Sequence, residues 1–169
     1  MKTNVTFIGM PGSGKSTFGR AVANALAWDF IDTDDLIEQA YGKPLQQQLD
    51  EVGYLALRER ESLIISQLNC TNTVIATGGS AVYGKQGMEH LKDIAHIFYL
   101  EVSEPVLLQR IDNMTTRGIA KAEDQSFSDM MAERVALYEC WGEQVLAAED
   151  PEKIGEMVEC VVDIIGVEK

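Results

Sequence analysis

Residues 9–16 read Gly-Met-Pro-Gly-Ser-Gly-Lys-Ser, which is the full Gly-x-x-x-x-Gly-Lys-Ser/Thr pattern of a phosphate-binding loop. A short apolar run at 4–8 precedes the loop, and a segment with helical spacing at 16–27 follows it. This order matters because the loop N–H groups and the helix N-terminus must face the phosphates together. A glycine-rich turn that binds nothing is the alternative, but chance rarely supplies both the motif and its context. The stretch therefore predicts a nucleotide site.

The side chains of the loop match the chemistry of a bound nucleoside triphosphate. Lys15 can reach the β- and γ-phosphates, and the hydroxyl of Ser16 can bind Mg²⁺. We therefore expect ATP as co-substrate and Mg²⁺ as cofactor. The residues expected to bind ATP in this segment are Gly12, Ser13, Gly14, Lys15, Ser16 and Thr17.

Strands and helices alternate beyond the loop. Apolar runs at 28–31, 73–76 and 96–100 predict further strands, and residues 145–147 give either a fifth strand or none. The alternation predicts a single α/β domain, 1–169, with a P-loop kinase fold: a five-stranded or four-stranded parallel sheet with helices on both faces. We expect helices at 36–41, 54–68, 103–111, 126–141 and 150–164, and a helical segment that starts at Pro44 and breaks at Gly53.

Ligands of such folds bind beyond the carboxyl ends of the parallel strands. The segments 9–16, 32–34 and 78–80 all fall at this edge of the predicted sheet. The polar stretch 112–125 has no sustained periodicity and contains Arg117, so we expect it to form a mobile lid.

Composition limits the partners. The chain has 14 Lys and Arg against 27 Asp and Glu, a formal net charge of −13, which repels nucleic acid and anionic membrane surfaces. Its three cysteines, at 70, 140 and 160, have no metal-ligand spacing and suggest free thiols in a reducing compartment. No stretch approaches the ~20 apolar residues of a membrane helix. We expect a cytoplasmic monomer that acts on a small molecule.

Asp32 and Asp34 follow the second predicted strand. Both side chains can face the site once the chain leaves the extended form, so that one could hold Mg²⁺ through water and the other an acceptor hydroxyl. Either could instead cap the following helix. The third strand ends in Thr77 where a Walker B carboxylate would stand, so Asp32 is needed for the metal.

Arginines and glycines supply further candidates. Arg58 and Glu61 lie on one helix face, so Glu61 could hold the Arg58 guanidinium for a bidentate grip on a carboxylate, although a solvated salt-bridged face is equally consistent with the spacing. Gly78 and Gly79 permit close approach of backbone to a ligand, or form a tight turn. Arg117 and Arg134 are ambiguous when each is taken alone.

Taken together, these elements resemble shikimate kinase over nearly the whole chain and in the same order. The combination is much more specific than any one of its members. It comprises the phosphate-binding loop, Asp32-Thr33-Asp34, Leu57-Arg58 with Glu61, the glycines after the third strand, a lid arginine, and Glu133-Arg134 leading into Leu137-Tyr138.

The resemblance implies ATP-dependent phosphorylation of the shikimate 3-hydroxyl, a step in aromatic amino acid biosynthesis. It implies that Asp34 contacts the acceptor hydroxyl and that Arg58 and Arg134 bind the substrate carboxylate. The remaining substrate-binding positions that it implies are Gly78, Gly79 and Ser80.

For the nucleotide side, the resemblance implies that Arg117 closes over the phosphates and acts in catalysis with Lys15 and Asp34. Asp32 would order the magnesium shell together with Ser16. Arg110 and Pro151 would lie near the adenine.

Three features depart from the family pattern and motivate other hypotheses. Ser80 stands where the family has a third glycine, the lid reads Arg117-Gly118-Ile119-Ala120 instead of Arg-Pro-Leu-Leu, and the segment 138–151 is short. One alternative is a kinase for another small hydroxylated metabolite, such as gluconate, homoserine or a nucleotide. Another is an ATP-binding sensor without catalysis.

Overall fold

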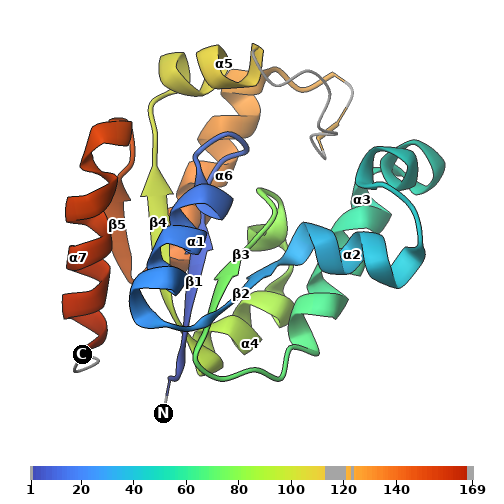
Figure 1. Cartoon of the computed structure of the whole chain (residues 1–169). Helices are drawn as coiled ribbons and strands as arrows, with labels where there is room; N and C mark the ends of the chain where they lie inside the picture. Colours follow the sequence, from blue (N-terminus) through green and yellow to red (C-terminus); the bar gives the residue numbers. More distant parts are fainter. Residues whose placement is uncertain (1, 113–120, 123, 167–169) are drawn as a thin grey trace.

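The computed structural model describes residues 2–112, 121–122 and 124–166. Strands and helices alternate along the chain from the N-terminus (Figure 1). The elements are β1 (Asn4–Ile8), α1 (Lys15–Leu26), β2 (Asp29–Asp32), α2 (Thr33–Tyr41), α3 (Leu45–Ser66), β3 (Thr73–Ala76), the 3₁₀ turn η1 (Ala81–Tyr83), α4 (Lys85–Ile94), β4 (Ala95–Glu101), α5 (Glu104–Asp112), α6 (Phe127–Trp141), β5 (Gln144–Ala147), the 3₁₀ turn η2 (Pro151–Lys153) and α7 (Ile154–Ile165).

The five strands form one parallel sheet in the order β2-β3-β1-β4-β5. The register pairs Phe7 of β1 with Ala76 of β3 on one side and with Phe98 of β4 on the other. β5 pairs with β4, so the five-stranded form of the prediction is confirmed. All five carboxyl ends therefore open on one edge, where the predicted ligand segments begin.

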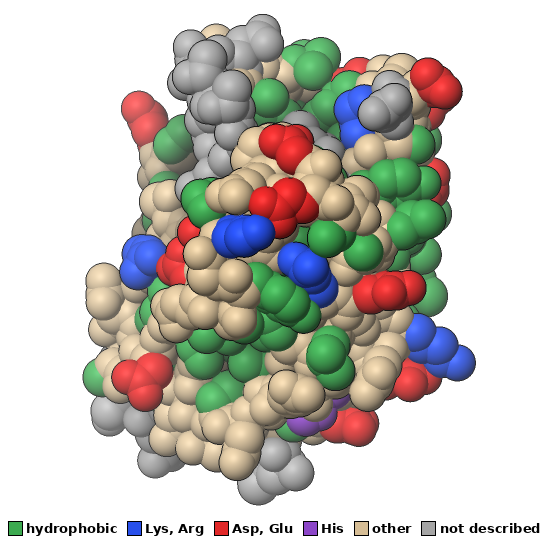
Figure 2. Space-filling model, turned by 90° about the vertical axis from the view of Figure 1, so that its right-hand side faces the viewer, with side chains coloured by type: hydrophobic (Ala, Val, Ile, Leu, Met, Phe, Trp, Pro, Cys, Tyr) green, Lys and Arg blue, Asp and Glu red, His purple; other side chains and the backbone are tan. Residues whose placement is uncertain are grey.

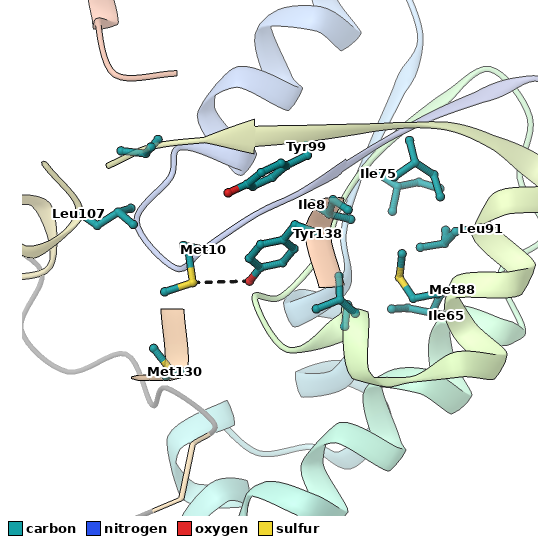
Figure 3. Packing of buried hydrophobic residues seen from close by; sticks show 14 residues of the cluster. Ile8, Met10, Ile65, Ile75, Met88, Leu91, Tyr99, Leu107, Met130 and Tyr138 are labelled. Carbon is teal, nitrogen blue, oxygen red and sulfur yellow. Dashed lines mark hydrogen bonds between the residues drawn. The ribbon is translucent and has the colours of Figure 1, made fainter. Parts of the chain in front are cut away.

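Each face of the sheet is covered by its own hydrophobic core, as the alternation of side chains along buried strands requires. Val5 and Phe7 of β1 pack with residues of α1 and α7 on one face. Ile8 of β1 packs on the other face in a core that includes Ile65, Met88 and residues of α6 (Figure 3). The sheet is thus a central layer between two helical layers (Figure 1).

Two elements were absent from the sequence prediction, η1 and α4. The α4 helix carries a glycine inside its first turn, Gly87, and its N-cap residue, Gly84, has no side chain to cap it, so its local helix signal is weak. Packing of Met88 and Leu91 into the core compensates for that weakness. The predicted break at Gly53 is confirmed, with φ 79° and ψ 168° inside α3.

In the part of the chain that the structure describes, no helix has the length and apolar character needed to cross a membrane.

Candidate active site

The phosphate-binding loop connects β1 to α1, as the motif predicts. Lys15 is buried, and its Nζ donates hydrogen bonds of 2.8 Å to the carbonyl oxygens of Gly9 and Met10. Burial lowers the pKa of the Lys15 ammonium to about 8, against the opposing effect of Asp34 and Asp32. Gly14 caps α1 with φ 93°, a left-handed conformation that glycine adopts without strain. The ammonium is thus held at the centre of a loop shaped for an anion.

Asp32 ends β2 and joins the loop to the following helix. Its Oδ1 accepts from the Asp34 N–H at 3.1 Å and caps α2, and its Oδ2 accepts from the Ser16 hydroxyl at 2.7 Å. Asp32 therefore caps the following helix, as one alternative expected, and its other carboxylate oxygen lies against Ser16 of the phosphate-binding loop. A hydroxyl and a carboxylate in contact fit Mg²⁺, which prefers hard oxygen ligands.

This pair suits a magnesium ion that relies on phosphate and water for its other ligands, as Mg²⁺ usually does in kinases. Among the residues that the structure describes, no three His, Cys, Asp or Glu side chains gather as a metal cluster.

Asp34, Glu61, Gly78 and Ser80 converge at the end of β3. A Cβ added at Gly78 would collide with Glu61 Oε1 and would lie 2.9 Å from Asp34 Oδ1. The Ser80 hydroxyl donates a 2.7 Å hydrogen bond to Glu61 Oε2. Gly78 is therefore required by close approach of two carboxylates, and the Ser80 side chain is turned toward Glu61.

Glu61 is 3% exposed, which makes it one of the least exposed charged residues in the part of the chain that the structure describes. Burial and, to a smaller extent, the nearby Asp34 raise the pKa of Glu61 to about 7, while Ser80, Arg134 and Lys15 oppose that rise. Part of the acceptor side, at Glu61, Ser80 and Arg134, is therefore buried, and ionisable groups of both signs lie close together there.

Arg134 reaches the site from α6. Its side chain is 1% exposed, and its Nη1 would lie 3.1 Å from a Cβ added at Gly79. The same virtual atom would lie 2.7 Å from Pro11 Cδ of the phosphate-binding loop. Gly79 is therefore the narrow point at which the loop, the end of β3 and Arg134 meet.

Tyr138 of α6 contacts both Gly79 and the phosphate-binding loop. Its hydroxyl donates a 2.6 Å hydrogen bond to the carbonyl of Gly79 and contacts Met10 Sδ at 3.8 Å (Figure 3). Its ring stacks on that of Tyr99 at 5.1 Å between centroids. One buried residue of α6 thus ties the phosphate-binding loop to the glycine segment.

Arg58 lies on the other side of the acceptor region, between two tyrosine rings. Its guanidinium carbon is 3.6 Å from the Tyr83 ring centroid and 4.9 Å from that of Tyr54. The expected support of Arg58 by Glu61 is not formed, since no ion pair between described residues joins them. Glu61 faces Ser80 instead, and the helix spacing could not distinguish these partners.

Arg110 and Pro151 lie at the nucleotide end. The Arg110 guanidinium donates to the carbonyls of Gly12 at 3.3 Å, Ala148 at 3.2 Å and Glu149 at 2.9 Å. It therefore links the phosphate-binding loop to the segment after β5, two residues before Pro151 begins η2. Arg117 and most of the predicted lid, 112–125, lie outside the described residues.

The geometry thus joins a phosphate-binding loop, a magnesium-type oxygen pair, a carboxylate and two arginines at one edge of the sheet. A model of the family described as shikimate kinase matches residues 11–165 of the chain. The chain belongs to the shikimate kinase family.

Individual members of the shikimate kinase family agree over most of their length. A shikimate kinase of Clostridium botulinum (strain 657 / Type Ba4) is 38% identical over 140 residues, which covers 80% of this chain and 82% of that protein. Shikimate kinase 2 of Yersinia enterocolitica is 30% identical over 174 residues, an alignment that covers 100% of this chain and 99% of that protein. The solved shikimate kinase from Acinetobacter baumannii, in complex with shikimate, superimposes with a TM-score of 0.87 at 26% identity, covering 98% and 93% of the two chains.

The fold brings three further residues into the site, Thr33, Tyr83 and Tyr138, to which the sequence alone assigns no role. Thr33 is buried, and its Oγ1 accepts from the Gly78 N–H at 3.2 Å. In the sequence, Thr33 and Tyr138 are defined only as members of the shikimate kinase pattern, and Tyr83 belongs to no motif. The spacing of Arg134, Tyr138 and Trp141 on one helix face was the signal available for α6, because such spacing marks the face that packs inward.

Proposed function

We propose that this protein transfers the γ-phosphoryl group of ATP to the 3-hydroxyl of shikimate. The observation that carries the proposal is the pair Arg58 and Arg134, both placed against the ring of Tyr83 on the acceptor side of the site. The positive charge of Arg134 acts against that of Arg58, and a carboxylate bound between the two guanidiniums would offset that repulsion. An acceptor that carries both a carboxylate and a hydroxyl fits this arrangement, as shikimate does.

At the acceptor, Asp34 would orient the hydroxyl and accept its proton as the phosphoryl group arrives. Its carboxylate lies next to Gly78 and Glu61, at the side of the site that faces Lys15. Phosphoryl transfer passes through a loose transition state, so orientation of the hydroxyl contributes more than strong basicity. The backbone at Gly78 and Gly79 would contact the ring of the acceptor. Ser80 would act indirectly, through its hydrogen bond to Glu61.

At the donor, the loop residues Gly12, Ser13 and Gly14 would hold the phosphates with backbone N–H groups, and Thr17 would extend this contact into α1. Lys15 would leave the carbonyls of Gly9 and Met10 to bind the β- and γ-phosphates. Mg²⁺, held by Ser16 and through water by Asp32, would neutralise the charge that develops on the phosphate oxygens.

The adenine would lie beside Arg110 and Pro151, which the hydrogen bonds of Arg110 bring to the same side as Gly12. Arg117 is proposed to close over the γ-phosphate from the lid. Its positive charge would supplement that of Lys15 during transfer.

We further propose a cytoplasmic monomer without nucleic-acid or membrane partners. The net charge of −13 supports the absence of polyanionic partners. On the face that carries α2 and α3, the Lys and Arg side chains of the described residues are interspersed with Asp and Glu and form no large basic patch (Figure 2). Cys70, Cys140 and Cys160 are free, as a reducing compartment favours.

An acceptor panel tests the proposed substrate. The protein with MgATP is offered shikimate, gluconate, homoserine and nucleoside monophosphates, and kcat/KM is measured for each by ADP release. Shikimate should exceed every other acceptor by at least about a hundredfold, because the others leave buried charged groups unmatched. Comparable or greater values for another acceptor would assign the site to that compound, and ATP binding without any turnover would indicate a sensor.

A further inference from the structure

Tyr83 lies between the two arginines of the acceptor site. Its ring centroid is 3.6 Å from the guanidinium carbon of Arg58 and 5.7 Å from that of Arg134. Both distances are within the range in which a cation is attracted to the face of an aromatic ring. One ring therefore contacts the charged groups of two helices, α3 and α6.

The fold fixes this position from the α3 side. A Cβ added at Gly84 would lie 2.5 Å from Ser62 Cβ, and the Gly87 N–H donates to the Ser62 hydroxyl at 3.2 Å. Ser62 is one helical turn after Arg58 on the same face of α3. The close approach that these glycines permit therefore places the preceding Tyr83 over Arg58.

The fold also fixes the position from the α6 side. Trp141 Nε1 donates to the carbonyl of Val82 at 3.2 Å, and Tyr138 holds Gly79 by a 2.6 Å bond. With Arg134 these two residues form one face of α6. Residues 79 and 82 are thus both hydrogen-bonded to that face of α6, and Tyr83, the next residue, lies beside Arg134.

We propose that Tyr83 is a positioning residue that holds Arg58 and Arg134 in register for one carboxylate. The proposal rests on the proposed function and deepens it, because it explains how two repelling guanidiniums stay ready for a carboxylate before the acceptor arrives. The electron-rich ring face stabilises both cations without neutralising them, so they still attract the carboxylate. A carboxylate side chain in the same place would instead compete with the acceptor.

The test compares Tyr83→Leu, which removes the ring, with Tyr83→Phe, which removes only the hydroxyl. Tyr83→Leu should raise the KM and Kd for shikimate roughly three- to thirtyfold, with kcat and the KM for ATP within about twofold of wild type. Tyr83→Phe should retain wild-type values. Methyl shikimate, which lacks the carboxylate charge, should bind wild type and Tyr83→Leu with nearly equal affinity.

Tyr41→Leu is the matched control. Its ring lies 4.0 Å from the guanidinium carbon of Arg60, a similar contact to α3 on a partly exposed surface. This variant should leave shikimate binding unchanged. Should Tyr83→Leu fail to fold, Tyr83→Met replaces it, since the flexible Met side chain fills the space without a ring.

Calorimetry of shikimate binding separates the two possible failures. If wild type binds shikimate and Tyr83→Leu binds it equally well, or if Tyr83→Phe loses as much affinity as Tyr83→Leu, the role of the ring is overturned while the proposed function stands. If wild type neither binds nor phosphorylates shikimate, the proposed function is overturned, and the role of Tyr83 with it.

Discussion

Ser80 and Glu61 are joined by a 2.7 Å hydrogen bond from the serine hydroxyl to Glu61 Oε2. Both side chains are buried, and the second carboxylate oxygen of Glu61 faces Gly78. The serine therefore supports a carboxyl whose burial and nearness to Asp34 raise its pKa to about 7. In this protein Ser80 acts on the acceptor site through Glu61, which gives the departure from a third glycine a defined physical effect.

Glu61 should make the unliganded protein less stable as pH rises. The pKa of Glu61 is about 7 in the folded state and about 4.5 ordinarily, so the folded state binds the proton of Glu61 more tightly than the unfolded state does. Proton binding therefore stabilises the fold fully below pH 4.5, and this contribution is lost as pH rises through 7. This shift in pKa corresponds to a loss of at most ~3 kcal/mol in the free energy of unfolding. Urea unfolding of wild type and Glu61→Gln at pH 5 and pH 8 measures it: wild type should lose stability relative to the variant at pH 8. If the two proteins differed in free energy of unfolding by the same amount at pH 5 and pH 8, the raised pKa of Glu61 would be contradicted.

Removal of the Ser80 hydroxyl should destabilise the protein most when Glu61 is charged. Ser80→Ala leaves a buried carboxylate oxygen without its donor, which costs about 1–3 kcal/mol at pH 8 and less at pH 5. Urea unfolding at both pH values checks this, with Ser80→Thr as the control because it keeps a hydroxyl. An equal cost at both pH values would mean that the loss comes from packing and not from support of the carboxylate.

Most of the fold could be predicted from the sequence because its signals are local. The loop at 9–16 predicts strand, turn and helix together, and the buried strands β1 and β3 are short, mostly apolar runs. The α4 helix escaped prediction because Gly87 weakens its local helix signal and its stability comes from packing of Met88 and Leu91. Tertiary packing of this kind overrides local propensity.

The site could be predicted only where residue type alone defines the chemistry. Lys15 and Ser16 lie in the phosphate-binding loop as its motif predicts, Asp32 contacts Ser16, and Asp34 lies beside Gly78. The contact of Arg58 with Tyr83 could not be predicted, because Glu61 satisfies the helix spacing while Tyr83 is 25 positions away. Tyr83 reaches Arg58 through packing of η1 and α4 against α3. Contacts between distant segments leave no mark in the local pattern.

Arg110 should support nucleotide binding specifically. Its guanidinium joins Gly12 to Ala148 and Glu149 by three hydrogen bonds that a shorter or apolar side chain cannot make. Arg110→Leu should therefore raise the KM for ATP by about tenfold, the effect of ~1.4 kcal/mol, and leave the KM for shikimate within about twofold.

Steady-state kinetics with each substrate varied in turn measures both constants for Arg110→Leu. Arg20→Leu is the control, because Arg20 lies 4.3 Å from the Phe30 ring on an exposed part of α1. Equal changes in both KM values would show that Arg110 supports the whole fold and not the nucleotide site.

The most direct test of the central claim is ADP release from MgATP in the presence and absence of shikimate, with Asp34→Asn measured beside wild type. The account predicts shikimate-dependent turnover by wild type at a kinase-like rate, ~1–100 s⁻¹, and a loss of at least about a hundredfold in kcat for Asp34→Asn with both substrates still bound. Turnover that does not depend on shikimate, or that survives in Asp34→Asn, would contradict it.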